Sequence, residues 1–294
     1  MSEPAIRVLR SGRLVFTADE LGEGPLVLCL HGFPDHRATW RHQLPALAQA
    51  GYRVVAPNLR GYEPSSQPAD GDYHLVRLGE DVAAWLEDLG DRRVHLVGHD
   101  WGAAVATVAA HLIPDRVASL TTLSVPPLRR MAAMIGHRPT ALLKLWYMAF
   151  FQLRGIAERT LLARDGALVR RLWASWSPGW TCPEPVMRAV LDTLGRPGVA
   201  RAAVAYYRHL PGVVTEPGRR SWRLLRARLQ VPTLMLTGEL DGCMDSRLYD
   251  VGFAPDDFAA DAQVARVEGA GHFLHLERPD EINGRLMDWL ARHA

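Results

Sequence analysis

The sequence is poor in the features that mark disulfide-rich, zinc-binding and membrane-spanning proteins. Its only three cysteines, Cys29, Cys182 and Cys243, lie far apart and lack the spacing of a zinc site or a disulfide framework. No apolar run reaches 18 residues, and the first residues lack the apolar core of a secretion signal. We therefore expect a soluble, cytoplasmic protein without an integral membrane segment.

Basic blocks are also absent, although positive charge is concentrated in the middle of the chain. Residues 128–228 hold 18 Lys or Arg against 5 Asp or Glu, whereas the whole chain of 294 residues has a net charge of only +2. This basic segment either docks on the acidic remainder of the chain, attracts anionic ligands, or attaches to nucleic acid or a membrane. Because the charges are spread over apolar helical patterns without an aromatic stacking motif, we favour internal docking and expect no nucleic-acid partner.

Strand-like and helical patterns alternate in the first part of the chain. Apolar runs predict buried strands at residues 26–30, 52–57, 94–97 and 117–123. Helical spacing is found at residues 40–50 and 75–89, and residues 13–17 alternate like an edge strand. This alternation predicts an α/β class with a mostly parallel central sheet and helices on both faces.

A helical stretch rich in aromatic residues interrupts the alternation. Residues 128–228 have helical patterning broken by prolines, after which strands are expected at 232–237 and 263–267, and a final helix at 279–292. We therefore expect a core in two parts, residues 1–127 and 229–294, with an inserted helical cap at 128–228.

The motif Gly98-His99-Asp100-Trp101-Gly102 joins a predicted strand to a predicted helix. Such a Gly-X-nucleophile-X-Gly turn holds its central side chain exposed above the sheet. A carboxylate at this position is already charged at neutral pH and attacks directly, which gives an ester. We interpret Asp100 as a nucleophile; the alternative is an Asp that only caps the helix.

An ester on Asp100 needs a base that activates water, and that base needs an orienting acid. His272 lies in the glycine-rich loop before the last helix, at the carboxyl edge of the sheet, whereas His275 and His99 are expected to be structural. Asp241 follows the strand at 232–237 and is the preferred acid, with the nearby acids Glu239 and Asp245 as weaker candidates.

The order nucleophile, acid, histidine is that of the α/β-hydrolase fold. In that fold an oxyanion hole is built from the amide after the nucleophile and an amide of a second loop. Here these donors are the backbone N–H groups of Trp101 and of Phe33, the latter in His31-Gly32-Phe33-Pro34.

Over nearly its whole length the chain resembles the α/β-hydrolase-fold family of epoxide hydrolases. The resemblance rests on residues 31–34, Arg60-Gly61-Tyr62, residues 98–102, Asp241 and Gly271-His272. In this family two cap tyrosines donate hydrogen bonds to the epoxide oxygen. The matching segments here are Trp146-Tyr147-Met148-Ala149-Phe150-Phe151-Gln152 and Ala205-Tyr206-Tyr207-Arg208.

The resemblance implies an ether-bond hydrolase that opens an epoxide with Asp100 and hydrolyses the resulting ester with His272 and Asp241, giving a vicinal diol. Tyr147 and Tyr207 would donate to the oxygen, with Tyr206 as the alternative to Tyr207. We expect the substrate to contact Phe33, Pro34, Trp101 and Phe151. The expected partners are a small epoxide and water, the expected cofactors and metals none, and the expected assembly a monomer or homodimer.

Two other functions stay open on the sequence. A haloalkane dehalogenase uses the same kind of Asp nucleophile, and Trp101 would supply an indole N–H near the halide, but the Phe33 side chain supplies no donor. A non-catalytic scaffold that binds a ligand under the cap is the alternative from another class. The chain also departs from the family where Glu63-Pro64-Ser65-Ser66 replaces a Gly-Asp-Ser type of continuation after Arg60-Gly61-Tyr62.

Overall fold

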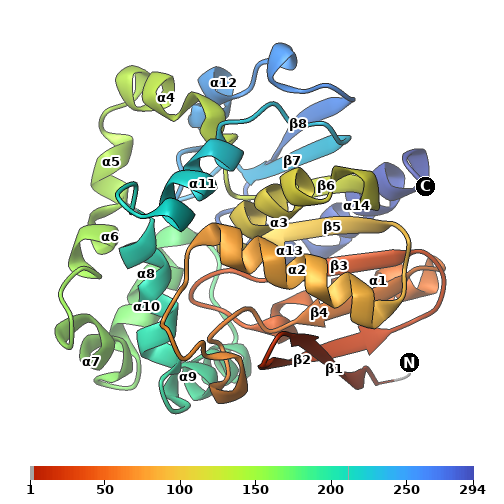
Figure 1. Ribbon diagram of the computed structural model, residues 1–294. Coiled ribbons are helices and arrows are strands. Elements are labelled where there is room, and N and C mark those ends of the chain that lie inside the picture. The colour runs from red at the N-terminus through yellow and green to blue at the C-terminus, as the bar shows by residue number, and fades with distance from the viewer. Residues whose placement is uncertain (1–2, 211) are drawn as a thin grey trace.

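An eight-stranded sheet forms the centre of the computed structural model, which describes residues 3–210 and 212–294 (Figure 1). Its strands are β1 (Ala5–Ser11), β2 (Leu14–Leu21), β3 (Leu26–Leu30), β4 (Arg53–Pro57), β5 (Val94–His99), β6 (Val117–Leu123), β7 (Thr233–Gly238) and β8 (Ala262–Val267). They lie in the order β1-β2-β4-β3-β5-β6-β7-β8. Only β2 runs antiparallel to its neighbours, β1 and β4, so the predicted, mostly parallel sheet is confirmed.

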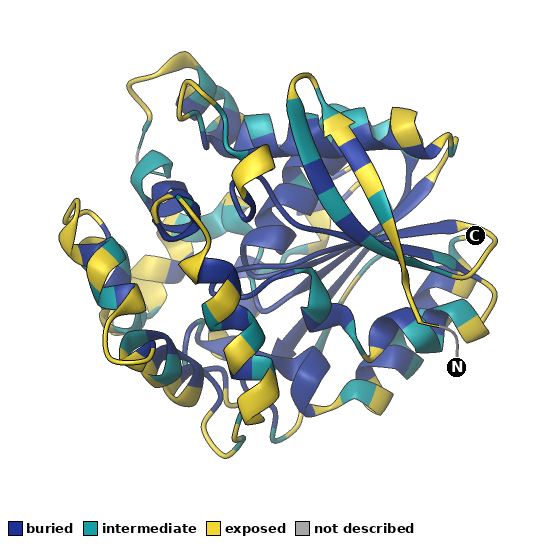
Figure 2. Cartoon of the chain, turned by 90° about the horizontal axis from the view of Figure 1, so that it is seen from below, coloured by how far each residue is buried: buried dark blue, intermediate teal, exposed yellow. Residues whose placement is uncertain are grey.

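Helices cover both faces of the sheet, as the strand-helix alternation predicts. These core helices are α1 (Gln43–Gln49), α2 (Leu75–Leu89), α3 (Trp101–Leu112), α12 (Tyr249–Gly252), α13 (Leu274–Glu277) and α14 (Pro279–Arg292). The apolar residues of α2 and α3 form one buried cluster with the sheet, and those of α1 and α14 form another. Figure 2 shows the central strands almost wholly buried, and these are β3 to β7.

The segment between β6 and β7 contains helices only, among its described residues. They are α4 (Met131–His137), α5 (Ala141–Lys144), α6 (Trp146–Phe150), α7 (Ile156–Leu162), α8 (Ala167–Trp176), α9 (Glu184–Gly195), α10 (Val199–His209) and α11 (Glu216–Leu225). Most of them lie beside the carboxyl edge of the sheet, on the left of Figure 1, whereas α11 packs against α2 and α3. We refer to residues 128–228 as the helical insertion.

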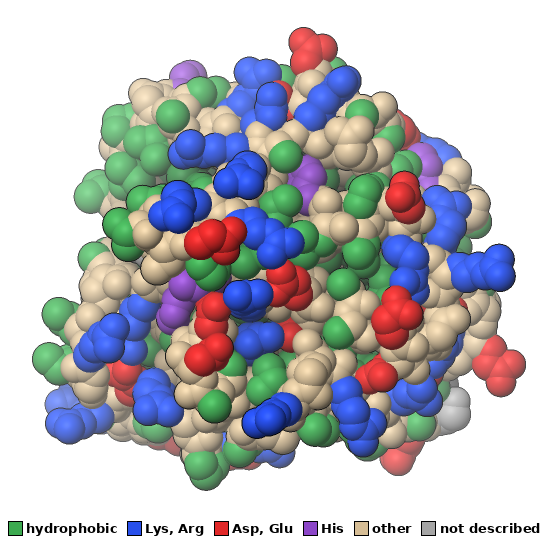
Figure 3. Space-filling view, in the orientation of Figure 1, with side chains coloured by type: hydrophobic (Ala, Val, Ile, Leu, Met, Phe, Trp, Pro, Cys, Tyr) green, Lys and Arg blue, Asp and Glu red, His purple; other side chains and the backbone are tan. Residues whose placement is uncertain are grey.

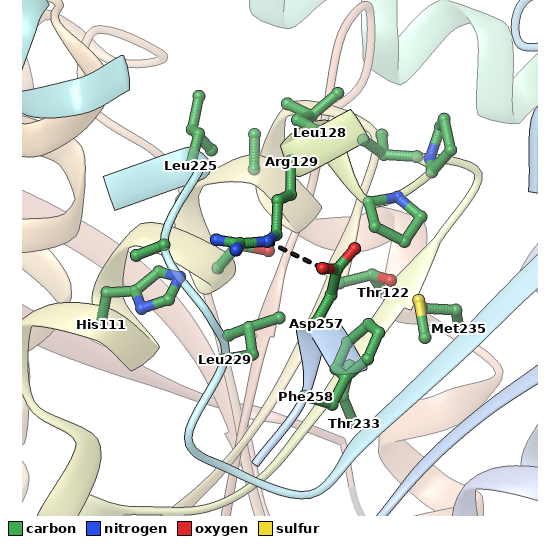
Figure 4. Close-up of a pocket in the computed structure, with 16 residues that line it drawn as sticks. His111, Thr122, Leu128, Arg129, Leu225, Leu229, Thr233, Met235, Asp257 and Phe258 are labelled. Atoms are coloured by element: carbon green, nitrogen blue, oxygen red, sulfur yellow. Dashed lines mark hydrogen bonds and ion pairs between the residues drawn. The ribbon is translucent and has the colours of Figure 1, made fainter. Parts of the chain in front are cut away.

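Salt bridges join the helical insertion to the core where the chain crosses between them. Asp257 accepts hydrogen bonds from Arg129 Nε at 2.8 Å and Arg130 Nε at 2.5 Å, and Arg129 also donates to the carbonyl oxygen of Arg226. A pocket with mainly apolar walls lies between the two crossings (Figure 4). Asp257 therefore fixes the first end of the insertion, and Arg129 links that end to the last one.

Other basic residues of the insertion also pair with core acids. Arg138 lies 3.1 Å from Asp245, and Arg220 lies 2.7 Å from Glu80. On the face shown in Figure 3, basic and acidic side chains are interspersed over the core helices, whereas hydrophobic ones gather over α4 to α6. These pairs support the interpretation that the basic segment docks on the acidic core.

Two local predictions were wrong. Residues 14–17 do lie in a strand, β2, but it is not the edge of the sheet, because β1 lies outside it and Ala18–Leu21 of β2 also pair with β4. Residues 40–50 are not one helix, because a 3-10 turn at Arg37–Trp40 precedes α1. Pro45 has no N–H, so it fits only the first turn of a helix, and α1 begins two residues before it.

Within the part of the chain that the structure describes, no helix has both the length and the apolar composition needed to cross a membrane.

Candidate active site

Asp100 stands at the sharp turn between β5 and α3. Its backbone has φ 51° and ψ −120°, a conformation that side-chain-bearing residues rarely adopt. The glycines on either side make the turn possible: a Cβ on Gly98 would lie 2.3 Å from the Gly102 carbonyl oxygen, and one on Gly102 would lie 2.0 Å from the Leu30 oxygen. The strained strand-turn-helix predicted from the motif is therefore present.

The Asp100 carboxylate is buried and directed at the loop after β3. Its Oδ1 accepts a hydrogen bond of 2.7 Å from the backbone N–H of Phe33. Burial tends to raise the pKa of Asp100, but His272, His99 and this amide lower it overall, so the carboxylate is charged at neutral pH. Trp101 follows directly as the first residue of α3, where a helix leaves its N–H groups free.

His272 joins the carboxylates of Asp100 and Asp241. Its Nε2 lies 3.7 Å from Asp100 Oδ2, and its Nδ1 lies 3.0 Å from Asp241 Oδ2. Asp241 is in turn fixed by the backbone, because its Oδ1 accepts from the N–H groups of Cys243 at 2.7 Å and Met244 at 2.8 Å. The structure thus brings the three predicted residues together, from three separate loops.

The two carboxylates determine the charge on His272. Burial alone would lower the pKa of the imidazole, but Asp241 and Asp100 outweigh it and raise the pKa to about 10. The resting site therefore holds an imidazolium between two carboxylates. Removal of the charge on Asp100 would lower the pKa of His272.

The alternative histidines and acids lie in structural positions. His99 Nε2 is 3.0 Å from the His272 carbonyl oxygen, and His275 Nε2 is 2.7 Å from the Thr39 hydroxyl. Burial lowers the pKa of His99 to about 3. Glu239 accepts from the Gly269 amide, and Asp245 binds Arg247 and Arg138, so neither acid reaches His272.

The neighbouring tyrosines of α10 point to different places. The Tyr206 hydroxyl donates to the carbonyl oxygen of Arg60 at 2.6 Å, which ties α10 to the core. The Tyr207 ring instead packs edge-on against Trp101 and Phe33, which flank Asp100, with centroid distances of 5.0 and 5.3 Å. Its hydroxyl is buried and has no hydrogen-bond partner among the described residues. Tyr207, and not Tyr206, therefore presents a free donor near Asp100.

Tyr147 of α6 lies beside Tyr207, with ring centroids 5.7 Å apart. Its hydroxyl is 3.3 Å from Cys243 Sγ. Burial raises the pKa of both tyrosines well above its usual value, and the nearby charge of Asp100 adds to the shift. Both phenols therefore stay protonated at neutral pH. Sequence reasoning missed Cys243, whose only signal was its position two residues after Asp241.

Aromatic rings form the walls of the site. Phe151 packs against Phe33 at 5.2 Å and against Tyr207 at 5.0 Å between centroids. Pro34 is buried beneath the insertion, where its carbonyl oxygen accepts a hydrogen bond of 3.1 Å from the Trp173 indole. Together with Trp101, the residues expected to contact substrate thus lie in a buried, mainly aromatic cluster next to Asp100.

Trp176, at the end of α8, is a second residue that sequence reasoning missed. Its carbonyl oxygen accepts from the N–H groups of Gly242 at 2.9 Å and His272 at 3.0 Å, so one atom of the insertion holds the loops of both Asp241 and His272. The approach requires glycine, because a Cβ on Gly242 would lie 1.9 Å from the Ser175 carbonyl oxygen. The two loops are thus positioned by the insertion as well as by the sheet.

This arrangement suits displacement at carbon followed by hydrolysis. A charged carboxylate is present as a nucleophile, and two protonated phenols lie in the same cluster of aromatic side chains. An imidazole lies within reach of the ester that would form, and amide donors lie at its carbonyl oxygen. Within residues 3–210 and 212–294, no group of three potential metal ligands gathers at Asp100.

Comparisons with known proteins match the whole chain. The sequence model of the alpha/beta hydrolase fold family matches residues 25–279. Epoxide hydrolase A of Mycobacterium tuberculosis is 32% identical over 99% of this chain and 98% of its own length. Epoxide hydrolase 3 of Siraitia grosvenorii is 33% identical over 92% and 93%. The crystal structure of epoxide hydrolase A from Mycobacterium thermoresistibile superimposes with a TM-score of 0.79 at 30% identity, covering 98% of each chain. The predicted α/β-hydrolase fold is thus confirmed.

Proposed function

Because the chain belongs to the epoxide hydrolase family of α/β-hydrolase-fold enzymes, we propose that it converts an apolar epoxide into a vicinal diol through an ester on Asp100. The helical insertion acts as a cap over the site. The free hydroxyl of Tyr207 carries this proposal, because a buried donor without a partner, near a carboxylate nucleophile, matches what an epoxide oxygen requires.

In the first step an Asp100 oxygen attacks a ring carbon, and the carbon–oxygen bond of the epoxide breaks. The oxygen that leaves is an alkoxide, which takes a proton from Tyr207 or Tyr147. The ester has no charge, so the pKa of His272 falls and its proton returns to the tyrosinate. His272 is then neutral and able to act as a base.

In the second step His272, oriented by Asp241, removes a proton from water as the water attacks the ester carbonyl. The amides of Phe33 and Trp101 stabilise the negative oxygen of the intermediate, an effect that is worth about 2.7–4 kcal/mol per donor in comparable sites. The intermediate releases the diol, whose oxygen takes the proton from His272. This leaves Asp100 as a carboxylic acid that holds the oxygen of the water. Its proton passes to His272, which restores the carboxylate and the imidazolium of the resting site.

A substrate panel tests the reaction class. We expect diol from styrene oxide and 1,2-epoxyhexane, and no bromide release from 1-bromohexane. Two phenols are suited to protonate the alkoxide that leaves in epoxide opening, whereas a bromide leaves without a proton and would not need them. Asp100→Asn is the matched inactive control. Bromide release without diol from either epoxide would contradict the proposal and favour a haloalkane dehalogenase.

The His272→Gln variant tests the two-step route. It retains the nucleophile but lacks the base, so the ester should accumulate on Asp100 and add the mass of the epoxide to the protein. Peptide mass spectrometry locates the addition. Unimpaired turnover by this variant would refute the role of His272 as the base.

A further inference from the structure

Three potential metal ligands meet where the helical insertion contacts the core, away from Asp100. Asp72 lies in the loop before α2, His74 is the residue that precedes α2, and His209 is the last residue of α10. One ligand atom from each lies within 4.8 Å of the other two. The cluster therefore draws on both parts of the molecule.

Hydrogen bonds orient both imidazoles. His74 Nδ1 lies 2.6 Å from Asp72 Oδ1, and His209 Nδ1 lies 2.8 Å from the carbonyl oxygen of Ala205. Both partners are acceptors, so each Nδ1 donates, and an ion would bind at Nε2. A histidine oriented in this way by a carboxylate or carbonyl is the usual form of a metal ligand in proteins.

The spacing of the two rings suits one shared ion. Their centroids are 4.6 Å apart and their planes are inclined at 82°. Two imidazoles bound to one tetrahedral zinc ion, with Zn–N bonds of roughly 2.0–2.1 Å, have centroids roughly 5 Å apart. His74 Nε2 now lies 2.9 Å from the Thr215 hydroxyl, which has a second acceptor in the Gly212 carbonyl oxygen, also at 2.9 Å. An ion would replace this contact of His74, and the Thr215 hydroxyl would keep its bond to Gly212.

The charges around the cluster fit a divalent ion that favours nitrogen. Asp72 supplies one negative charge and also binds Arg77, 3.1 Å away. Two imidazole nitrogens supported by one carboxylate suit Zn²⁺ or Ni²⁺ better than Ca²⁺ or Mg²⁺, which require more oxygen ligands.

We propose that His74 and His209, supported by Asp72, form a binding site for a zinc-class divalent ion that fastens α10 to the core. The same helix carries Tyr207, and a small cavity beside His209 extends to Trp101 and Tyr206. An ion at this site would restrain the part of the insertion that faces Asp100. The proposal does not depend on the proposed catalytic route.

Calorimetric titration of the tag-free full chain with ZnCl₂, and the visible absorption of added Co²⁺, test the site directly. We expect one equivalent to bind, with a Co²⁺ spectrum typical of nitrogen and oxygen ligands. His74→Asn and His209→Asn should each weaken binding at least tenfold, and Asp72→Asn about 10- to 100-fold because it removes the orienting carboxylate. His137→Asn, at an exposed histidine at the end of α4, is the matched control and should bind like the wild type.

A thermal melt measures the link between insertion and core. Zinc should raise the Tm of the wild type and of His137→Asn, and leave that of His209→Asn unchanged. Melts without zinc show whether each variant is folded. The proposal is overturned if the wild type binds no Co²⁺, or if folded His74→Asn and His209→Asn both bind with wild-type affinity.

Discussion

Replacing each of the two adjacent tyrosines by phenylalanine should separate catalysis from stability. Tyr207→Phe removes the free hydroxyl beside Asp100, whereas Tyr206→Phe removes a hydroxyl that is bonded to the Arg60 carbonyl oxygen. Both substitutions delete one oxygen atom from a buried ring of α10. We therefore expect opposite effects from two nearly identical changes.

The magnitudes follow from the partners. Loss of one hydrogen-bond donor to a developing oxyanion lowers kcat about 10²–10³-fold. Because Tyr147 remains as the second donor, we expect Tyr207→Phe to lower kcat by that factor. Deleting an unpaired buried hydroxyl leaves stability unchanged or higher. Tyr206→Phe leaves the buried Arg60 carbonyl oxygen without its hydrogen-bond donor. It should therefore lower the unfolding free energy by about 1–3 kcal/mol and leave kcat close to that of the wild type.

Single-turnover diol formation and urea denaturation measure the two effects on the same preparations. The ratio of ester formation to ester hydrolysis adds a check, because Tyr207 acts only in ring opening. A Tyr207→Phe variant with wild-type ring opening, or a Tyr206→Phe variant that loses as much activity as Tyr207→Phe, would refute the assignment of the donor.

Two further substitutions test the geometry around His272. Gly242→Ala places a Cβ 1.9 Å from the Ser175 oxygen and should lower the unfolding free energy, measured by urea denaturation, by about 1–3 kcal/mol. The control Gly284→Ala, in α14 with open space around it, should raise the unfolding free energy by about 0.5–1 kcal/mol. Equal effects of the two substitutions would argue against the tight contact at Gly242. Asp100→Asn should lower the pKa of His272, now about 10, in an NMR titration. A histidine whose pKa is raised by folding stabilises the fold fully below its unfolded-state pKa, which is about 6.5. The unfolding free energy should therefore fall as the pH rises from about 6.5 to about 10, and should fall less steeply in Asp100→Asn. An unchanged pKa of His272 in Asp100→Asn would contradict the ion pair between His272 and Asp100.

The sequence was most informative where local chemistry determines structure. The glycines around Asp100 predict its turn, and the regular spacing of residues 75–89 predicts α2 to the residue, up to Gly90 with its left-handed φ of 74°. The strand order places His272 and Asp241 at one edge of the sheet. Tyr147 and Tyr207 needed the family resemblance, because an amphipathic helix carries similar tyrosines for packing alone.

The missed features depend on contacts between distant segments. Cys243 and Tyr147 are 96 residues apart, and the Trp176 carbonyl belongs to a backbone whose position no local pattern encodes. The edge strand β1 was not predicted, because Ile6 and Val8 face solvent, with 61% and 44% exposure. Its apolar residues therefore do not form the pattern of a buried strand. Periodicity reports only the buried face.

Single turnover in H₂¹⁸O tests the ester on Asp100 most directly. With enzyme in excess over epoxide, the oxygen of the attacking water should enter the Asp100 carboxylate and the diol should remain unlabelled, because the diol oxygens come from the epoxide and from the original carboxylate. Mass spectrometry of the peptide that contains Asp100 detects the label. Label in the diol after the first turnover, with an unlabelled Asp100, would mean that water attacks the epoxide directly and would contradict the account.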